Sequence, residues 1–593
     1  MTDITVTMQD DAVESGYRAV CRELGLEPVE RGPGEGERGG HPVVRSLAEA
    51  RAARGRDTVL VLDEAGMTTV AIVAGDWSSG CPDCLHSKVL ALAHYYSGDR
   101  DDPLDVEAAI ALVARVRDRH GVVLALTDGY RAQNWSVCVA VPGCAGCATR
   151  ERSPDDLARA LGQTVAEPAP TSTVAAPAPA PLEHPAIEHD PTAGLRGASG
   201  AEFVARNRAA IGFASILGNP VAVEEELEVS LLNAPVFVAG DPEAHEVAGG
   251  KGADVEQSLA SCVGEGLERY LLAGAYRLPA TIATREELGD AACSPTVEFG
   301  FPARDAHPGV ERYRDDLEIE WVLADDLHTG ERRFVPANLV YCPYLPGGGA
   351  PAISVGSTNG AATGATVADA TRQALLESVE RDAFWYYART GIPPLAVSQS
   401  CLPRDVEVGM SVMRGQFFTH VLENPFGVPV AHVTFESDVL EGARSARGTG
   451  ATPRLESSIR RAYAECMQMY HSLSTGIAVD RVTTDMRHAW FTGRSRSLFP
   501  ALFTRGRPPG GGVEALPGVD PALEILASAR EQGLSAYRVV LAETDSFAVV
   551  KVLVGGMALM DATYFEYGHR FHDLARSLGH PEPRLRYTES LFM

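Results

Sequence analysis

Hydrophobic positions in residues 1–166 follow two alternating spacings. Short apolar runs bounded by turn residues predict buried strands, and apolar residues three and four apart predict helices. The runs predict strands at 58–63, 68–75, 121–127 and 134–141, and the helical spacings predict helices at 86–97 and 105–118. Strands that alternate with helices are typical of an α/β domain, so we expect a small α/β domain here.

Residues 167–199 break this pattern. They include EPAPTSTVAAPAPAPLEHPAIEHDP, which is rich in Pro and Ala and has no apolar period. Proline fixes φ and lacks an N–H donor, so such a stretch is typical of a semi-extended linker. We therefore expect a linker at 167–199 and a second domain over residues 200–593.

The second domain mixes strands with long helices. The expected helices are 255–273, 367–388 and 455–472, and the expected strands are 428–435, 536–543 and 547–556.

Two of these helices carry the same acidic motif. Residues 249–270 read GGKGADVEQSLASCVGEGLERY, and residues 360–387 read GAATGATVADATRQALLESVERDAFWYY. Each reaches the first Glu of E-x-x-E-R thirteen residues after the Gly of a Gly-Ala pair. The looser third copy, GTGATPRLESSIRRAYAECMQ, reaches Glu465 after fifteen residues.

On a helix, positions i and i+3 share a face, so each E-x-x-E presents two carboxylates side by side. Two such helices that face each other gather four carboxylates, and each close pair costs on the order of a few kcal/mol without a cation. Mg²⁺ resolves the repulsion and keeps positions for phosphate oxygens, which favours a nucleotide site. The alternative is a solvated helix face with Glu265 paired to Arg269 at i+4. The equal spacing of two copies favours the metal site.

Four of the eleven cysteines form two CxxC pairs, Cys81 with Cys84 and Cys144 with Cys147. Two such pairs can give four thiolates to one tetrahedral Zn²⁺, and four protein ligands leave no open position for catalysis. His86 and Cys138 are the substitutes if one ligand is wrong. A redox-active CxxC and unligated thiols are the other readings.

The sequence blocks GGKGAD…E-x-x-E-R, S-x-x-N-G…QALLESVERDAFW and RRAYAE-x-x-Q resemble the signatures of the YcaO superfamily, over roughly residues 200–590. The resemblance implies an α+β fold with mixed sheets and long helices, with ATP and Mg²⁺ between the E-x-x-E helices. The positions that it implies for ATP and Mg²⁺ are Lys251, Glu265, Glu268, Asn359, Asp369, Glu377, Glu380, Arg461 and Glu465.

Paired CxxC motifs ahead of such a domain are similar to the azoline-forming members, the cyclodehydratases of thiazole/oxazole-modified peptides. GCPDCL also resembles the tail of their ThiF-like partner proteins, of which residues 1–166 would be a remnant. The resemblance implies ATP-dependent conversion of Cys, Ser or Thr in a ribosomal precursor peptide, as in peptide antibiotic biosynthesis. It also implies a separate leader-binding, ThiF-like partner and a flavin-dependent azoline dehydrogenase that acts afterwards.

One feature departs from the azoline-forming pattern. Those members often end in Pro-x-Pro-x-Pro, whereas this chain ends in GHPEPRLRYTESLFM, with a single Pro-x-Pro. The catalytic general base is therefore unassigned, and thioamide- or amidine-forming chemistry and a non-catalytic YcaO scaffold remain alternatives.

The formal net charge of −27 argues against nucleic acid and anionic membranes as partners. The N-terminus, MTDITVTMQDDAVE, lacks a basic-then-apolar signal pattern, so we expect a cytoplasmic protein. If the chain assembles with a second copy of itself, we expect a homodimer.

Overall fold

The fold is described from a computed structural model. The residues that it describes are 43–45, 47–54, 58–64, 67–73, 80–96, 122–127, 134–142, 144, 146, 152–164, 187–190, 194–212, 215–224, 228–237, 245–301, 309–346, 349–354, 356–437, 439, 445–474, 496, 499–508, 520–558 and 568–585. The helix expected at 105–118, Cys147 and residues 167–186 lie outside them. None of the described helices is long and apolar enough to cross a bilayer.

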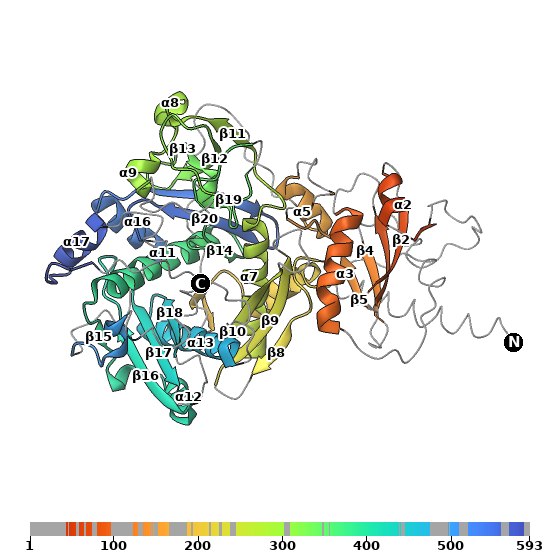
Figure 1. The fold of residues 1–593 in the computed structure, drawn as a ribbon. Helices are drawn as coiled ribbons and strands as arrows, with labels where there is room; N and C mark the ends of the chain where they lie inside the picture. Colours follow the sequence, from red (N-terminus) through yellow and green to blue (C-terminus); the bar gives the residue numbers. More distant parts are fainter. Residues whose placement is uncertain are drawn as a thin grey trace.

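The N-terminal part is built on one five-stranded sheet in the order β1-β2-β3-β4-β5 (Figure 1). Its elements are β1 (Val43–Val44), α2 (Leu47–Ala52), β2 (Thr58–Glu64), β3 (Met67–Val73), α3 (Pro82–Tyr96), β4 (Val122–Thr127) and β5 (Asn134–Val137), and α5 (Pro154–Ala160) follows. Only β1 pairs parallel to its neighbour, and β2 to β5 pair antiparallel.

The expected strands and the first expected helix are thus present, but the expected α/β arrangement is wrong for this sheet. Strands β2 and β3 are separated by two residues only, which suffices for a hairpin and not for a parallel crossover. The sheet is therefore mainly antiparallel.

Part of the linker expected at 167–199 forms regular structure. Strands β6 (Ile187–Asp190) and β7 (Gly194–Arg196) pair antiparallel. Helix α6 (Gly200–Arg206) begins four residues after the end of β7, and the Ser199 side chain caps it by accepting from the N–H of Glu202.

The second part holds three larger sheets of mixed α+β character (Figure 1). One has the order β10-β9-β8, one β11-β12-β19-β20-β14 with β13 beside β12, and one β15-β16-β17-β18. The strands are β8 (Val221–Glu224), β9 (Ser230–Phe237), β10 (His245–Gly252), β11 (Ala280–Ala283), β12 (Ile319–Asp326), β13 (Arg332–Pro336), β14 (Ala361–Gly364), β15 (Leu395–Ala396), β16 (Gly415–Val421), β17 (Val430–Ser437), β18 (Ser445–Ala451), β19 (Ala536–Glu543) and β20 (Ala548–Val554).

The three long helices expected from the sequence are confirmed, and shorter helices lie between and after them. The helices are α7 (Val255–Leu272), α8 (Arg285–Leu288), α9 (Pro295–Phe299), α10 (Ala337–Val340), α11 (Val367–Thr390), α12 (Arg404–Val412), α13 (Leu455–Ser474), α16 (Pro521–Glu531) and α17 (Gly568–Ser577).

The long helices belong to three similar strand–turn–helix units, β10–α7, β14–α11 and β18–α13. Each strand ends at or next to the Gly of a Gly-Ala pair, and the helix starts a few residues later. Glycine lets each helix lie close to its own strand: a Cβ on Gly250 would stand 2.0 Å from the Ser258 carbonyl oxygen, and one on Gly448 2.1 Å from that of Ala462. The sequence repeat is therefore a structural repeat.

The three units form a closed ring. Helix α7 packs on β10 and also on β14, α11 packs on β14 and also on β18, and α13 packs on β18 and also on β10. Each helix thus covers its own strand and reaches the strand of the next unit. This ring places the acidic faces of the three helices around one centre.

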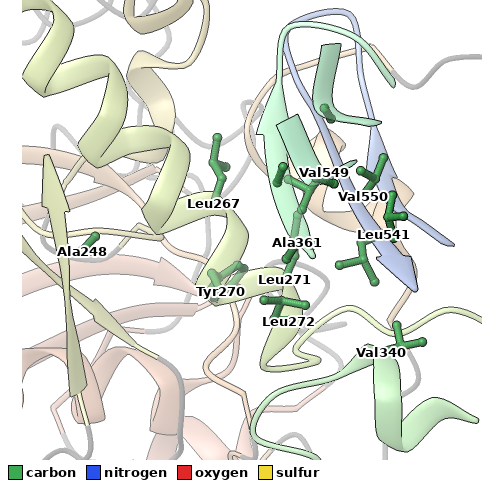
Figure 2. Packing of buried hydrophobic residues seen from close by; sticks show 14 of the residues in the cluster. Ala248, Leu267, Tyr270, Leu271, Leu272, Val340, Ala361, Leu541, Val549 and Val550 are labelled. Atoms are coloured by element: carbon green, nitrogen blue, oxygen red, sulfur yellow. The ribbon is translucent and has the colours of Figure 1, made fainter. Parts of the chain in front are cut away.

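Helix α7 is held between two sheets. Figure 2 shows Leu267, Tyr270 and Leu271 of α7 between the strand that carries Ala248 and the sheet that carries Val549. All five residues are fully buried. Truncating a fully buried leucine such as Leu271 to alanine typically costs about 2–5 kcal/mol, so this packing fixes the helix firmly.

Candidate functional site

A cavity of about 340 Å³ lies at the centre of the ring. Residues of all three units and of the β7–α6 segment line it. Its charged lining consists of six carboxylate residues, Glu265, Glu268, Asp369, Glu377, Glu380 and Glu465, and five basic residues, Arg196, Lys251, Arg269, Arg381 and Arg461. This mixture suits a ligand that carries both cations and anionic groups, as a metal-bound polyphosphate does.

The carboxylates occupy equivalent places on the three helices. Glu265, Glu377 and Glu465 each stand ten residues after the first residue of their helix. Because the three units close a ring, equal positions bring these side chains to the same centre. The looser spacing of the third copy arises from two extra residues in the turn before α13.

Basic side chains hold the carboxylates of α7 and α11 in this structure. Arg269 donates from its Nε to Glu265 Oε1 at 2.8 Å. The Nε of Arg381 lies 3.5 Å from Glu377 Oε1. The i+4 pair of Glu265 and Arg269 therefore exists, but it lines a cavity in which two other carboxylates, those of Asp369 and Glu380, are almost fully buried. A solvated helix face does not have this surrounding.

Three carboxylates that line the cavity have raised pKa values. Burial, reinforced by the charges of Glu377 and Glu265, raises the pKa of Glu268 well above its usual range. Burial likewise raises the pKa of Glu377, against the opposing effect of Arg381, and it raises that of Glu380 to about 7. A bound cation would favour the charged form of all three.

Glu465 behaves differently from its neighbours. Burial alone would raise its pKa, but Lys251, Arg381 and the backbone N–H of Thr449 together lower it below the usual range. Lys251 also donates to Gln468 Oε1 of α13 at 3.3 Å. The charge of Glu465 is therefore compensated by the protein itself.

Asp369 joins the cavity from the first turn of α11. Its Oδ2 accepts from the N–H of Ala365 at 3.1 Å, and Arg372 lies 3.4 Å from its Oδ1. Arg372 also forms an ion pair with Asp520 at 2.8 Å, so it does not neutralise Asp369 alone.

Asn359 is the one expected residue that does not line the cavity. Its neighbour Thr358 lines it instead. The backbone carbonyls of Ser357 and Asn359 accept from Lys551 Nζ at 2.5 and 2.6 Å. This buried amine, whose pKa burial lowers to about 8, holds the 357–359 loop against the cavity.

Arg196 is the main site residue that the sequence did not reveal. It ends β7, within the expected linker, and lines the cavity. Burial lowers its pKa to about 10, while the nearby charge of Asp369 opposes that shift. Further polar lining residues that the sequence left out are Ser199, Gln257, Ser261, Thr363, Gln373 and Gln468. No motif in the sequence marks Arg196, which lies five residues after the Pro/Ala-rich stretch that ends at Pro191.

The cysteines form a second site, in the N-terminal part. The Sγ atoms of Cys81, Cys84 and Cys144 are buried, and Cys81 Sγ lies 3.7 Å from each of the other two. Sulfurs around a tetrahedral zinc, with Zn–S of about 2.3 Å, stand about 3.8 Å apart. Disulfide sulfurs are about 2.05 Å apart, so these residues are not disulfide-bonded.

The donor set therefore fits zinc. Cys84 Sγ also accepts from the N–H of Val141 at 3.2 Å, a contact that stabilises a thiolate. In the described part of the chain, this trio is the only group of three or more His, Cys, Asp or Glu ligand atoms within 4.8 Å of one another. It contains neither His86 nor Cys138.

The family model described as YcaO cyclodehydratase, ATP- and Mg²⁺-binding, matches residues 249–558. An uncharacterized protein of Methanothermobacter thermautotrophicus is 31% identical over 192 residues, which is 32% of this chain and 47% of that protein. The chain thus spans about half the length of the curated relative that it matches.

Two solved structures share the fold. One, described as a heterocyclase in complex with substrate and cofactor, has a TM-score of 0.67 at 19% identity and covers 97% of this chain and 84% of its own. The heterocyclase TruD has a TM-score of 0.56 at 17% identity, with coverage of 96% and 80%. The mixed α+β fold with several antiparallel sheets is confirmed.

Proposed function

Because this chain belongs to the YcaO family, we propose that it is an ATP-dependent cyclodehydratase that converts Cys, Ser or Thr of a ribosomal precursor peptide into azolines. The observation that carries the proposal is the cavity at the centre of the ring, with its six carboxylate and five basic residues. Its volume of about 340 Å³ lies within the usual range of small-molecule sites.

The carboxylates are assigned to Mg²⁺ and the basic residues to phosphates. Glu265, Glu268, Glu377 and Glu380 would hold the ions, and Asp369 and Glu465 line the same cavity. Bound Mg²⁺ supplies positive charge that offsets the negative charge of phosphoryl transfer. Arg269 and Arg381, which pair with Glu265 and Glu377 here, would then exchange these carboxylates for phosphate oxygens.

The proposed reaction runs in three bond changes. The sulfur or oxygen of the substrate side chain attacks the preceding amide carbon and passes its proton to a base. The resulting oxyanion attacks the γ-phosphorus of ATP and releases ADP. The phosphate then leaves from the former carbonyl carbon while the ring nitrogen gives up its proton to a base, which forms the C=N bond of the azoline. The chain's contribution is to position the amide and to stabilise the developing charge.

The cysteine site is proposed to hold one structural zinc through Cys81, Cys84, Cys144 and Cys147. The distances and burial of the three described sulfurs support this assignment. Zinc there would stabilise the N-terminal part and take no part in the reaction, because four thiolates close its coordination shell.

The domain division is proposed with one change from the expected boundaries. Residues 1–166 form the N-terminal unit, and the catalytic unit begins at the β6–β7 hairpin, since Arg196 lines the central cavity. A separate leader-binding partner and a later flavin-dependent dehydrogenase belong to the same proposal.

Mass spectrometry of a precursor peptide tests the function. The peptide is incubated with the chain, a leader-binding partner and Mg-ATP. Loss of one water per ring supports azoline formation. Exchange of oxygen for sulfur indicates a thioamide-forming enzyme instead, and an unchanged mass with ATP left intact indicates a scaffold. Omitting the partner shows whether the chain depends on it.

A further inference from the structure

A short buried segment connects the cysteine site with helix α7. Residues 139–141 follow β5, lie outside any named strand and are at most 2 % exposed. Buried backbone groups outside a sheet need other hydrogen-bond partners. In this segment, those partners come from two different parts of the chain.

The cysteine-bearing helix α3 supplies the first set. Cys84 Sγ accepts from the N–H of Val141 at 3.2 Å. Lys88, one turn further along α3, donates from its Nζ to the Val139 carbonyl at 2.7 Å and to the Ser215 carbonyl at 3.0 Å. The segment is thereby fastened to the residues that would bind the metal.

Two tyrosines of the catalytic unit supply the second set. Tyr270 of α7 donates its hydroxyl to the Ala140 carbonyl at 2.5 Å, and the Ala140 N–H donates to the Tyr276 hydroxyl at 3.4 Å. Both rings are almost fully buried, and their centroids lie 6.1 Å apart. The N–H and the carbonyl of Ala140 are thus both hydrogen-bonded to tyrosine side chains from α7 and the segment just after it.

Tyr270 lies on the same helix as two of the cavity carboxylates. Tyr270 stands two residues after Glu268 and five after Glu265 on the same continuous helix. Figure 2 shows it on α7 near Leu271, among buried hydrophobic residues of the core. A displacement of Ala140 would therefore be transmitted to the stretch of α7 that carries the cavity carboxylates.

We infer that Tyr270 and Tyr276 are positioning residues that couple the cysteine site to the carboxylates of α7. Metal bound by Cys81, Cys84 and Cys144 fixes segment 139–141, and the two hydroxyls pass that order to α7. The inference rests on the proposed function, because it concerns the same Mg-ATP site. Coupling of this kind is reciprocal: if zinc strengthens Mg-ATP binding, Mg-ATP must strengthen zinc binding equally.

The test compares the wild type with the double variant Tyr270→Phe/Tyr276→Phe, which keeps both buried rings and removes both hydroxyls. Tyr341→Phe is the matched control. Tyr341 is buried, and its hydroxyl accepts from the N–H of Leu278 at 3.0 Å, entirely within the catalytic unit. Zinc content is measured in each purified protein, before and after treatment with a chelator.

Hydrogen exchange of the α7 amides is the first readout. We expect metal removal to speed exchange in α7 of the wild type and of Tyr341→Phe, and to leave it unchanged in the double variant. Equal responses in all three proteins, or no response in the wild type, would overturn the coupling.

The affinity for Mg-ATP is the second readout. Metal removal should weaken it about fivefold or more in the wild type, and by less than twofold in the double variant. If no protein binds Mg-ATP while α7 exchange still follows the metal in the wild type and in Tyr341→Phe but not in the double variant, the proposed function fails and the coupling stands.

Discussion

Glu380 of α11 and Glu465 of α13 bind the same strand from two different helices. Glu380 accepts from the N–H of Ala451 and Glu465 from that of Thr449, both at 3.1 Å. The two carboxylates are thus fixed side by side at the end of β18, although they come from separate sequence motifs. Burial raises the pKa of Glu380 to about 7, whereas Lys251 and Arg381 overcome burial and lower that of Glu465. Similar backbone contacts therefore accompany pKa shifts in opposite directions.

The first prediction concerns Glu265 and Glu377. Glu265→Gln and Glu377→Gln should each lower ATP-dependent modification at least about 100-fold, because Gln keeps the volume but not the charge that holds Mg²⁺. Glu377→Gln should also raise the free energy of unfolding of the metal-free protein by roughly 1 kcal/mol or less, since burial disfavours its charged form. Turnover assays and denaturant melts measure the two effects.

The exposed Glu524 of α16 provides the control for these variants. Glu524→Gln makes the same chemical change outside the cavity, so it should leave turnover within twofold of the wild type. Normal turnover in both cavity variants would contradict the claim that Glu265 and Glu377 hold Mg²⁺.

The second prediction concerns Arg196. Arg196→Ala should weaken Mg-ATP binding roughly 10- to 100-fold, the usual value of a charge-assisted hydrogen bond. Arg196→Lys should recover only part of this loss, because an ammonium group lacks the planar fork of guanidinium. Equilibrium binding of Mg-ATP measures both. Arg206, exposed at the end of α6, is the control position, and an equal loss in Arg206→Ala would point to a general charge effect.

The third prediction concerns the cysteine site. The purified protein should contain one equivalent of zinc, and Cys81→Ser should lose it, because Cys81 Sγ lies 3.7 Å from two other sulfurs. Cys401→Ser should keep it, since Cys401 is partly exposed and outside the trio. Metal analysis decides, and less than half an equivalent in protein never exposed to a chelator would refute the assignment.

The fourth prediction is a pH effect on stability. His420 is fully buried and its Nε2 lies 2.8 Å from the Thr504 carbonyl; burial lowers its pKa to about 4. In the unfolded chain, His420 binds a proton once the pH falls below the ordinary histidine pKa of about 6.5. In the folded chain, it does not bind this proton until the pH is about 4. Stability should therefore fall as the pH drops from about 6.5 toward 4.

The variant His420→Gln isolates this effect. It should lose roughly 2 kcal/mol less than the wild type between pH 6.5 and 4.5, as measured by denaturant unfolding. His569, which is exposed on α17, is the control, and His569→Gln should follow the wild type. A slope in His420→Gln equal to that of the wild type would show that His420 is not the titrating group.

The sequence predicted the acidic centre well for a local reason. The Gly-Ala turn, the helix start and the position of Glu265 or Glu377 are all set within one strand–turn–helix unit, and repetition exposed them. What repetition cannot show is that α7 reaches β14, α11 reaches β18 and α13 reaches β10. The ring depends on tertiary packing, which no single unit encodes.

The sequence motifs do not show which residues outside the three long helices line the cavity. Arg196 follows a Pro/Ala-rich stretch, and its approach depends on the β6–β7 hairpin. Asn359 was expected in the cavity, but the turn directs Thr358 there. In the N-terminal part, the apolar runs located the strands correctly but carried no information on their direction, so the antiparallel pairing was missed.

The central claim is that the cavity between α7, α11 and α13 binds Mg-ATP. Calorimetric titration with Mg-ATP tests it most directly, because it needs neither a precursor nor a partner. We predict one site per chain in the wild type and in Glu524→Gln, and no measurable binding in Glu265→Gln/Glu377→Gln. Equal binding in all three proteins would contradict the claim, as would the absence of binding in the wild type.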